Sequence, residues 1–170
     1  PQVPGWRKIR NWYNQMKSMM RAVGKTSSSG GKGKEERVKQ SARTYLSKAR
    51  ALLDKLEESK ETFPMTNITD LLIMLELERF MGLLGKHIDL LDRRIIKGEE
   101  IPHEEKIFSI FEEYTEWITK GKLHPNVELG KKLAITTDQY NLIVDYRVME
   151  HQSDPEIVKP LAERLTSSFP

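Results

Sequence analysis

Four histidines are the side chains in this chain best suited to hold a metal ion: His87, His103, His124 and His151. None of them belongs to an HExxH or His-x-His array, so the spacing typical of metal ligands is absent. His87 lies on an expected helix near its apolar stripe, which is typical of a histidine packed in or beside a core. We therefore expect no metal site at these histidines.

Acidic residues near the C-terminus form a second candidate group, consisting of Asp138, Asp145, Glu150 and Asp154. Carboxylates at strand ends can hold Mg²⁺ for phosphoryl transfer. A structural role is favoured for three of them, because Asp138 suits a turn, Asp154 a helix cap and Asp145 a solvent-facing strand position. The sequence therefore predicts no catalytic residue and no metal ligand in this group.

Other reaction classes are excluded by composition. The chain has no cysteine, which excludes disulfides, cysteine-ligated zinc and a thiol nucleophile. It also lacks the G-x-S-x-G nucleophile motif. The residues Gly24-Lys25-Thr26 imitate the end of a phosphate-binding loop, but Met19 stands where that motif requires glycine. We expect neither a cofactor nor a small-molecule substrate in this chain.

Charge is distributed very unevenly. Residues 1–50 carry 13 Lys and Arg residues but only two acids, Glu35 and Glu36, a net charge of +11. The remaining residues carry 15 basic and 23 acidic side chains, a net charge of −8. Such a basic block attracts polyanions, most often nucleic acid, through release of counterions. The alternatives are a solvated surface and a surface that pairs with the acidic remainder.

The N-terminal candidates for DNA contact lie in this basic block. They are Arg7, Lys8, Arg10, Lys17, Arg21, Lys25, Lys32, Lys34, Arg37, Lys39 and Arg43. Many of them fall on an expected helix, residues 6–23, or in an expected flexible basic loop, residues 24–34. Trp6 and Trp12 are expected to pack between helices rather than stack on bases.

Apolar spacing predicts the helices that position this block. The expected face of helix 6–23 consists of Ile9, Tyr13, Met16, Met20 and Val23. Residues 35–62 carry a heptad seam formed by Val38, Ala42, Tyr45, Ala49, Leu52 and Leu56. A third helix begins after Asn67, with Asp70 completing a capping box, and ends at Gly98. Its expected face consists of Ile73, Leu77, Phe80, Leu84, Ile88, Leu91 and Ile95. This spacing therefore predicts that residues 6–98 form an antiparallel helical hairpin or a three-helix unit.

The C-terminal part has a different pattern. Residues 107–118 fit either a helix or a strand. Residues 133–137 and 142–148 are expected to form an antiparallel hairpin around the turn 138–141, and residues 154–168 a helix. The buried strand face would carry Leu142, Val144, Tyr146 and Val148. The expected fold is mostly α with a small α+β part, divided into a basic helical region, 1–100, and a second part, 101–170.

A series of short motifs in this second part resembles bacterial insertion-sequence transposases of the DDE type. The motifs are Lys120-Gly121-Lys122, Val127-Glu128-Leu129-Gly130, Lys132-Leu133-Ala134-Ile135, Asp138-Gln139, Leu142 to Tyr146, and a helix from Asp154 through Pro160-Leu161. The resemblance covers residues 107–168 and, more loosely, the helices and loop of residues 1–100.

This resemblance implies a partial ribonuclease-H-like core. Enzymes of that family cut and join DNA with two divalent metals, held by two aspartates and a glutamate. By the order of their motifs, this chain lies between the two catalytic aspartates, so Asp138 and Asp145 are not the catalytic acids. Mg²⁺ or Mn²⁺ is expected for the parent enzyme, and the chain alone is not expected to be catalytic. Lys120, Lys122 and Lys132, with Lys131 beside them, are further candidates for DNA contact.

The resulting hypothesis is a DNA-binding fragment of a transposase, cut from a longer protein and acting in DNA transposition. The expected partners are DNA and, as an open alternative, a second copy in a homodimer. No apolar run reaches the length of a membrane span, so no membrane partner and a cytoplasmic, nucleoid-associated location are expected. The rival hypothesis is a helical protein-interaction module whose basic surface is merely solvated. A complete metal-dependent nuclease is disfavoured because the acids do not cluster in the sequence.

Overall fold

The computed structural model describes residues 6, 9–119, 121, 126–150 and 152–168. Arg7, Lys8, Lys120 and Lys122, which the sequence nominates for DNA contact, lie outside these residues. The chain forms two compact units, Pro1–Ile107 and Phe108–Pro170, called here the helical unit and the hairpin unit. The predicted division after residue 100 falls inside the helical unit.

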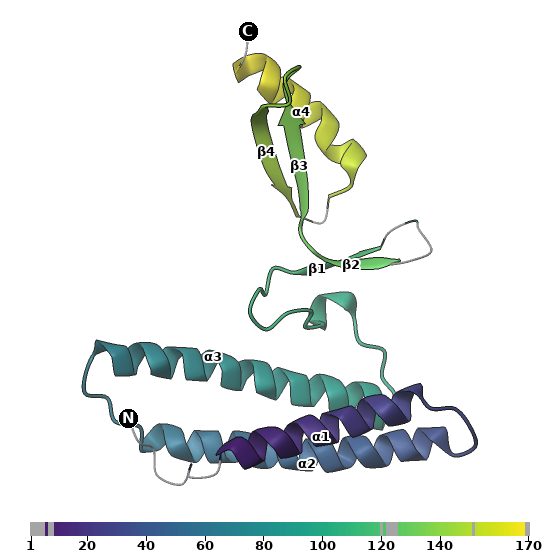
Figure 1. The fold of residues 1–170 in the computed structure, drawn as a ribbon, viewed down its shortest axis with the longest axis vertical. Coiled ribbons are helices and arrows are strands. Elements are labelled where there is room, and N and C mark those ends of the chain that lie inside the picture. The colour runs from purple at the N-terminus through teal and green to yellow at the C-terminus, as the bar shows by residue number, and fades with distance from the viewer. Residues whose placement is uncertain (1–5, 7–8, 120, 122–125, 151, 169–170) are drawn as a thin grey trace. The chain divides into compact units, whose positions relative to one another are not determined.

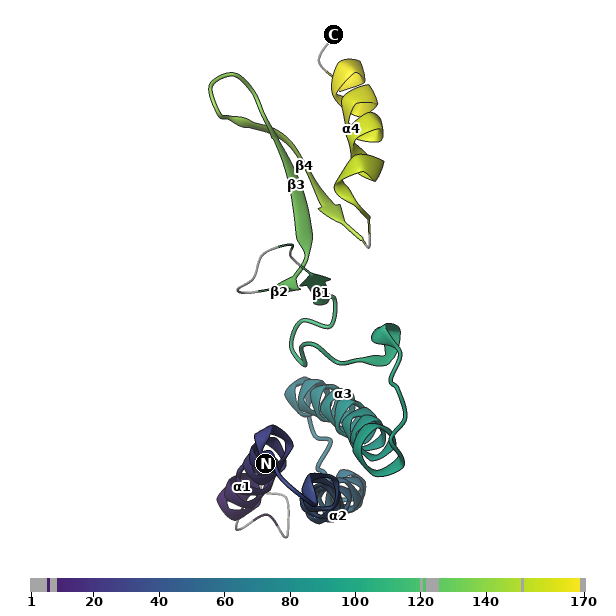
Figure 2. The same ribbon diagram turned by 90° about the vertical axis from the view of Figure 1, so that its right-hand side faces the viewer.

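Three long helices make up most of the helical unit (Figures 1 and 2). They are α1 (Ile9–Ser28), α2 (Lys34–Glu61) and α3 (Ile68–Leu91). The central helix α2 packs against both α1 and α3. A π-helix, Asp92–Lys97, continues α3 and ends at Gly98, whose φ of 77° is the left-handed conformation that glycine adopts readily. A 3-10 turn, His103–Glu105, follows.

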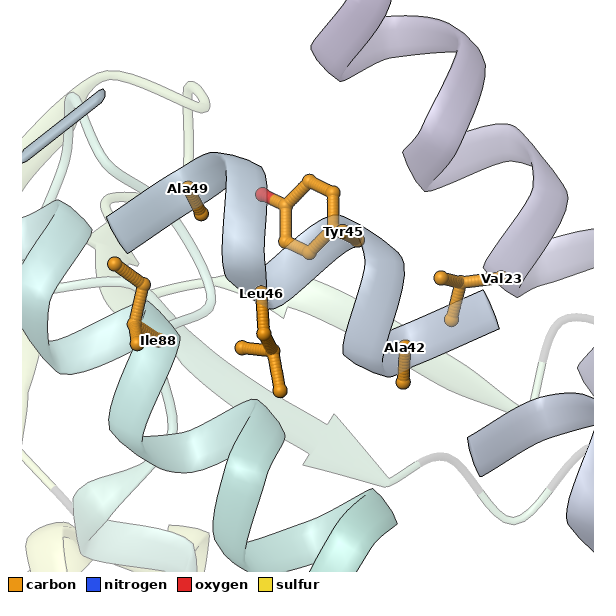
Figure 3. Packing of buried hydrophobic residues seen from close by; sticks show 6 residues of the cluster. All are labelled: Val23, Ala42, Tyr45, Leu46, Ala49 and Ile88. Carbon is orange, nitrogen blue, oxygen red and sulfur yellow. The ribbon is translucent and has the colours of Figure 1, made fainter. Parts of the chain in front are cut away.

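The core lies between these helices, and α2 supplies most of it. Its buried cluster consists of Val23, Ala42, Tyr45, Leu46, Ala49 and Ile88. Figure 3 shows these six side chains between the three helices. The centre of the predicted heptad seam is therefore confirmed, because Ala42, Tyr45 and Ala49 are all buried. Leu46, which the seam does not include, is only 1% exposed.

Helix α1 is longer than predicted and presents a different face. It continues to Ser28, so residues 24–28 are helical and the predicted loop shortens to residues 29–33. The hydroxyl groups of Thr26 and Ser28 donate to carbonyl groups three and four residues earlier, as serine and threonine do within helices. The predicted face is wrong for Ile9, Tyr13 and Met20, which are exposed.

Both N-terminal tryptophans contact α2, as predicted, Trp12 from α1 and Trp6 from ahead of that helix. Trp6 Nε1 donates to Ser59 Oγ over 2.6 Å. The ammonium group of Lys48 lies 3.7 Å from the centre of the Trp12 ring, and that of Lys55 lies 5.2 Å from the Trp6 ring. Because these lysines of α2 approach the rings, Trp12 contributes to the contact between α1 and α2, and Trp6 packs on α2 as well.

Helix α3 begins with the expected cap but without the expected box. The Asn67 side chain accepts a hydrogen bond from the Asp70 amide over 3.0 Å. The Asp70 carboxylate, however, accepts from the amide and hydroxyl of Thr66 instead of from Asn67. These two bonds lower the pKa of the buried Asp70 carboxyl. The predicted stripe is also shifted at the start of α3, where Met74 is buried and Ile73 is 39% exposed.

The described residues of the hairpin unit form two separate antiparallel pairs of strands and one helix. Strand β1 (Glu116–Thr119) pairs with β2 (Val127–Gly130), and β3 (Lys132–Thr137) pairs with β4 (Ile143–Met149). Helix α4 (Asp154–Ser168) follows. Of the ambiguous segment 107–118, only the end from Glu116 is a strand, and the remainder is neither helix nor strand apart from isolated turns. The coarse fold class, mostly α with a small α+β part, is confirmed.

The β3–β4 turn matches its prediction closely. Asp138 Oδ1 accepts from the Tyr140 and Leu142 amides over 2.8 and 2.9 Å. Asn141 has a φ of 63°, a conformation that asparagine tolerates better than most residues. The start of α4 is also as expected, although Asp154 is not the cap. The Glu156 carboxylate instead accepts from both the amide and the hydroxyl of Ser153.

The orientation of the β3–β4 hairpin is the reverse of the predicted one. Val144, Tyr146 and Val148, expected to face inward, are 37%, 67% and 50% exposed. Leu133 and Ile135, which pair with Val148 and Tyr146, are each 51% exposed on the same face. The predicted solvent position of Asp145 is wrong, because its carboxylate is half-buried and accepts a hydrogen bond from Arg164 of α4.

Candidate nucleic-acid interface

Four of the predicted DNA contacts form one face of α1. Arg10, Lys17, Arg21 and Lys25 are all exposed and follow one another at spacings of seven, four and four residues. At 3.6 residues per turn, this spacing aligns them along one side of the helix. Met16, Met19 and Val23, which pack against the core, lie on the opposite side. We call the four cations the basic face.

The basic face retains its charge. Helix α1 contains no acidic residue. In the described part of the chain, Arg10, Arg21 and Lys25 have no ion-pair partner, and Lys17 donates only to the Tyr13 hydroxyl over 3.2 Å. A row of unpaired cations produces a positive potential that adjacent carboxylates do not cancel.

The cations at the start of α2 have other roles. Lys39 pairs with Glu35 over 2.6 Å, which lowers the pKa of that carboxyl, and Arg43 pairs with Glu36 over 3.0 Å. Arg37 donates to the carbonyl groups of Gly30 and Lys32 over 3.0 and 2.6 Å. It thereby holds the turn between α1 and α2. These three predicted contacts are therefore less available to an external anion than the basic face.

The same turn carries two exposed lysines, Lys32 and Lys34. Gly31 and Gly33 have φ angles of 92° and 72°, which other residues adopt only with strain. These two glycines allow a turn of five residues, so both lysines stay close to the end of α1. In the described residues neither lysine has an ion-pair partner.

The described lysines of the hairpin unit that the sequence nominates for DNA contact have acidic neighbours, unlike those of the basic face. Lys132 Nζ lies 3.8 Å from the Asp154 carboxylate, and Lys131 pairs with Glu116. Both lysines line a groove whose other charged residues are Glu128 and Asp154. A groove with balanced charge offers little attraction to a polyanion.

The candidate acids and histidines form no catalytic arrangement that the structure describes. Among those residues no three His, Asp or Glu side chains come together as metal ligands would. His87 is a packed histidine, as predicted, and its Nε2 lies 3.0 Å from the Tyr45 hydroxyl. Burial lowers the pKa of the His87 imidazole.

Sequence reasoning missed one cation that lines a groove of the helical unit. Arg94 lies in the π-helix and lines a groove together with Lys34 and Lys39. The pair Arg93-Arg94 is visible in the sequence, but the i→i+5 turn that places these residues has no recognisable sequence signal.

Comparison with known proteins places no constraint on these assignments. No family model matches the chain, and no curated protein or solved structure is significantly similar to it. Among the helices described, none combines the length and apolar character needed to cross a membrane.

Proposed function

We propose that this chain binds DNA through the basic face of α1, as part of a transposase of the DDE type. The observation that carries the DNA-binding proposal is the row Arg10, Lys17, Arg21 and Lys25, unaccompanied by any acid in the helix. Arg10 and Lys25 are separated by 15 residues, or about 22 Å along the helix axis. This length suits contact with several successive phosphates of one duplex.

The expected mode of binding is independent of base sequence. Lysine and arginine contacts to phosphates position a protein on DNA without reading its bases. Neutralising about four phosphates predicts a slope of roughly −3.6 for log affinity against log salt concentration. Affinity should therefore fall steeply as salt is raised.

The transposase assignment rests on the motifs between Lys120 and Leu161. In that proposal β3 and β4 are neighbouring strands of a partial ribonuclease-H-like core, and α4 is its first helix. The catalytic acids and their Mg²⁺ or Mn²⁺ ions belong to the parent protein, so the chain alone positions DNA without cutting it. The exposed apolar face of the β3–β4 hairpin is what this proposal expects, because other elements of the parent protein would cover that face.

Fluorescence anisotropy with a labelled duplex, at several salt concentrations, tests DNA binding directly. The Lys17→Gln/Arg21→Gln variant should bind more weakly and lose about two units of salt slope. The matched control is Lys86→Gln/Lys159→Gln, which removes two exposed cations outside the basic face. Absence of binding by the unmodified chain at low salt, or equal losses in both variants, would contradict the proposal.

A second candidate function is protein interaction, and α3 carries the observation that favours it. Ile68, Leu71, Leu72 and Leu75 are 69%, 40%, 60% and 53% exposed. Their i, i+3, i+4, i+7 spacing forms an apolar stripe of the kind that binds another helix. Self-association that persists at high salt in sedimentation experiments, and is abolished by Leu72→Glu, would support this function. A monomer that binds DNA would argue against it.

A further inference from the structure

A groove lies at one end of the helical unit, where α1, α2 and the π-helix meet. Its polar lining consists of Ser27 from α1, Lys34, Glu35 and Lys39 from α2, and Arg94 from the π-helix. Val38 and Ile95 supply apolar parts of the wall. The groove therefore contains three cations and one carboxylate, and that carboxylate, Glu35, is already paired with Lys39.

Two neighbouring arginines of the π-helix have opposite environments. Arg93 interacts with the carboxylates of Asp89, Glu99 and Glu105, which raise the pKa of its guanidinium group. Arg94 has no carboxylate partner in the described part of the chain, and its Nη1 donates to the Glu99 carbonyl over 3.3 Å. Arg93 thus anchors the segment, whereas Arg94 retains donors for an external acceptor.

Both arginines lie in the π-helix. Such segments are rare in proteins and are frequently found at functional sites. Asp92, at its start, is held by Arg50 over 3.1 Å and by Lys97 over 3.4 Å. With Asp92 and Arg93 both fixed, the register that directs Arg94 into the groove is fixed as well.

The groove has the chemistry of a phosphate site. A guanidinium group offers a planar set of donors that matches phosphate oxygens, and an ammonium group adds a compact charge. Lys34 is exposed and, within the described residues, has no ion-pair partner. The Ser27 hydroxyl adds a neutral donor from α1.

We propose that this groove binds a backbone phosphate of DNA, with Arg94 and Lys34 as its principal contacts. This inference rests on the proposed DNA binding and extends it from α1 to the π-helix. It assigns a contact outside the N-terminal basic block of the sequence. The groove would then add a phosphate contact separate from the row of cations on α1, because none of those four cations lines it.

The test uses the full chain and the same labelled duplex. Arg94→Gln should weaken binding about tenfold and reduce the salt slope by about one. Arg94→Lys keeps the charge but loses the planar donors, so its affinity for the duplex should lie between that of Arg94→Gln and that of the unmodified chain. The control is Lys86→Gln on α3, which removes an exposed cation that does not line the groove, and no loss is expected. Unchanged thermal unfolding of Arg94→Gln shows that the helical unit remains folded.

The outcomes separate this inference from the proposed function. If Arg94→Gln binds like the unmodified chain while Lys17→Gln/Arg21→Gln loses affinity, the groove assignment is overturned and the proposed function stands. If the unmodified chain does not bind DNA at all, both are overturned. NMR shifts at Ser27, Lys34 and Arg94 on titration with inorganic phosphate, without DNA binding, would instead assign the groove to free phosphate.

Discussion

The two units of this chain bury their apolar residues in different ways. The helical unit encloses a cluster drawn from α1, α2 and α3, and Leu46 at its centre is 1% exposed. In the hairpin unit, the described residues include only two buried apolar side chains, Met149 and Ile157. The apolar face of its β3–β4 hairpin is exposed instead.

The difference arises because helices and two-stranded hairpins bury their apolar faces in different ways. A helix in a three-helix unit buries one stripe against its neighbours, so the unit can close on itself. A two-stranded hairpin with one helix covers only one of its two faces, and such a pair of strands is marginally stable in water. The helical unit should therefore fold independently, whereas the hairpin unit should depend on its few buried contacts.

The largest expected effect is at the centre of the helical unit. Replacing Leu46 by alanine leaves a cavity in a packed core and should reduce the free energy of unfolding by about 3–5 kcal/mol. Chemical denaturation followed by circular dichroism at 222 nm measures this loss. The control is Leu72→Ala on α3, because Leu72 is 60% exposed and its removal should change stability by at most about 0.5 kcal/mol. Equal losses for the two variants would show that the helical unit lacks the core described.

A substitution in the hairpin unit should cause a smaller loss of stability, confined to that unit. Ile157→Ala removes one of the buried side chains of the hairpin unit and should cost about 2 kcal/mol. Because that unit has little other core, we expect its amide NMR signals to lose dispersion while those of the helical unit are unchanged. Val158→Ala, at a neighbouring residue that is 63% exposed, is the control. Simultaneous unfolding of both units would show that their stabilities are coupled.

The same contrast explains what the sequence could predict. The core face of α2 and the Asp138 turn were predictable, because apolar spacing and local turn chemistry determine them. The face of α1 was not, because the ring contacts of Trp12 and the packing of Met19 set its rotation. In the hairpin, alternation identified the strand but not the covered face, which depends on where α4 packs.

Prediction of the candidate site from the sequence was also only partly possible. Residue type nominated all four cations of the basic face and helical spacing aligned Arg10, Lys17 and Arg21, whereas Lys25 was expected in a loop and lies on α1 only because the helix extends to Ser28. Which cations remain unpaired was not, because the ion pairs Lys39–Glu35 and Arg43–Glu36 depend on side-chain placement along α2. The groove contact Arg94 lies in a π-helix that has no recognisable sequence signal, and the extension of α1 to Ser28 was not predicted either.

Helix caps offer a finer comparison of the two units. In α3 the Asn67 side chain accepts from the Asp70 amide, whereas in α4 the Glu156 side chain reaches back to Ser153. Asn67→Ala should cost about 1 kcal/mol, because the Asp70 amide loses its acceptor. Ser153→Ala should cost less, since Glu156 can still accept from the backbone amide at residue 153. Thermal unfolding of each variant checks this order, and a larger loss for Ser153→Ala would contradict it.

The smallest expected effect is a dependence of the stability of the helical unit on pH. Burial lowers the pKa of His87 in the folded state from the ordinary value of 6.5, so the unfolded chain binds a proton first as pH falls. Stability should therefore be constant above this value, decline as pH falls through it, and level off below the folded-state pKa. His87→Gln should flatten the decline between about pH 7 and pH 5, where few carboxylates titrate. The exposed His103, replaced by glutamine, should leave the decline in place, and identical profiles for both variants would remove His87 as its cause.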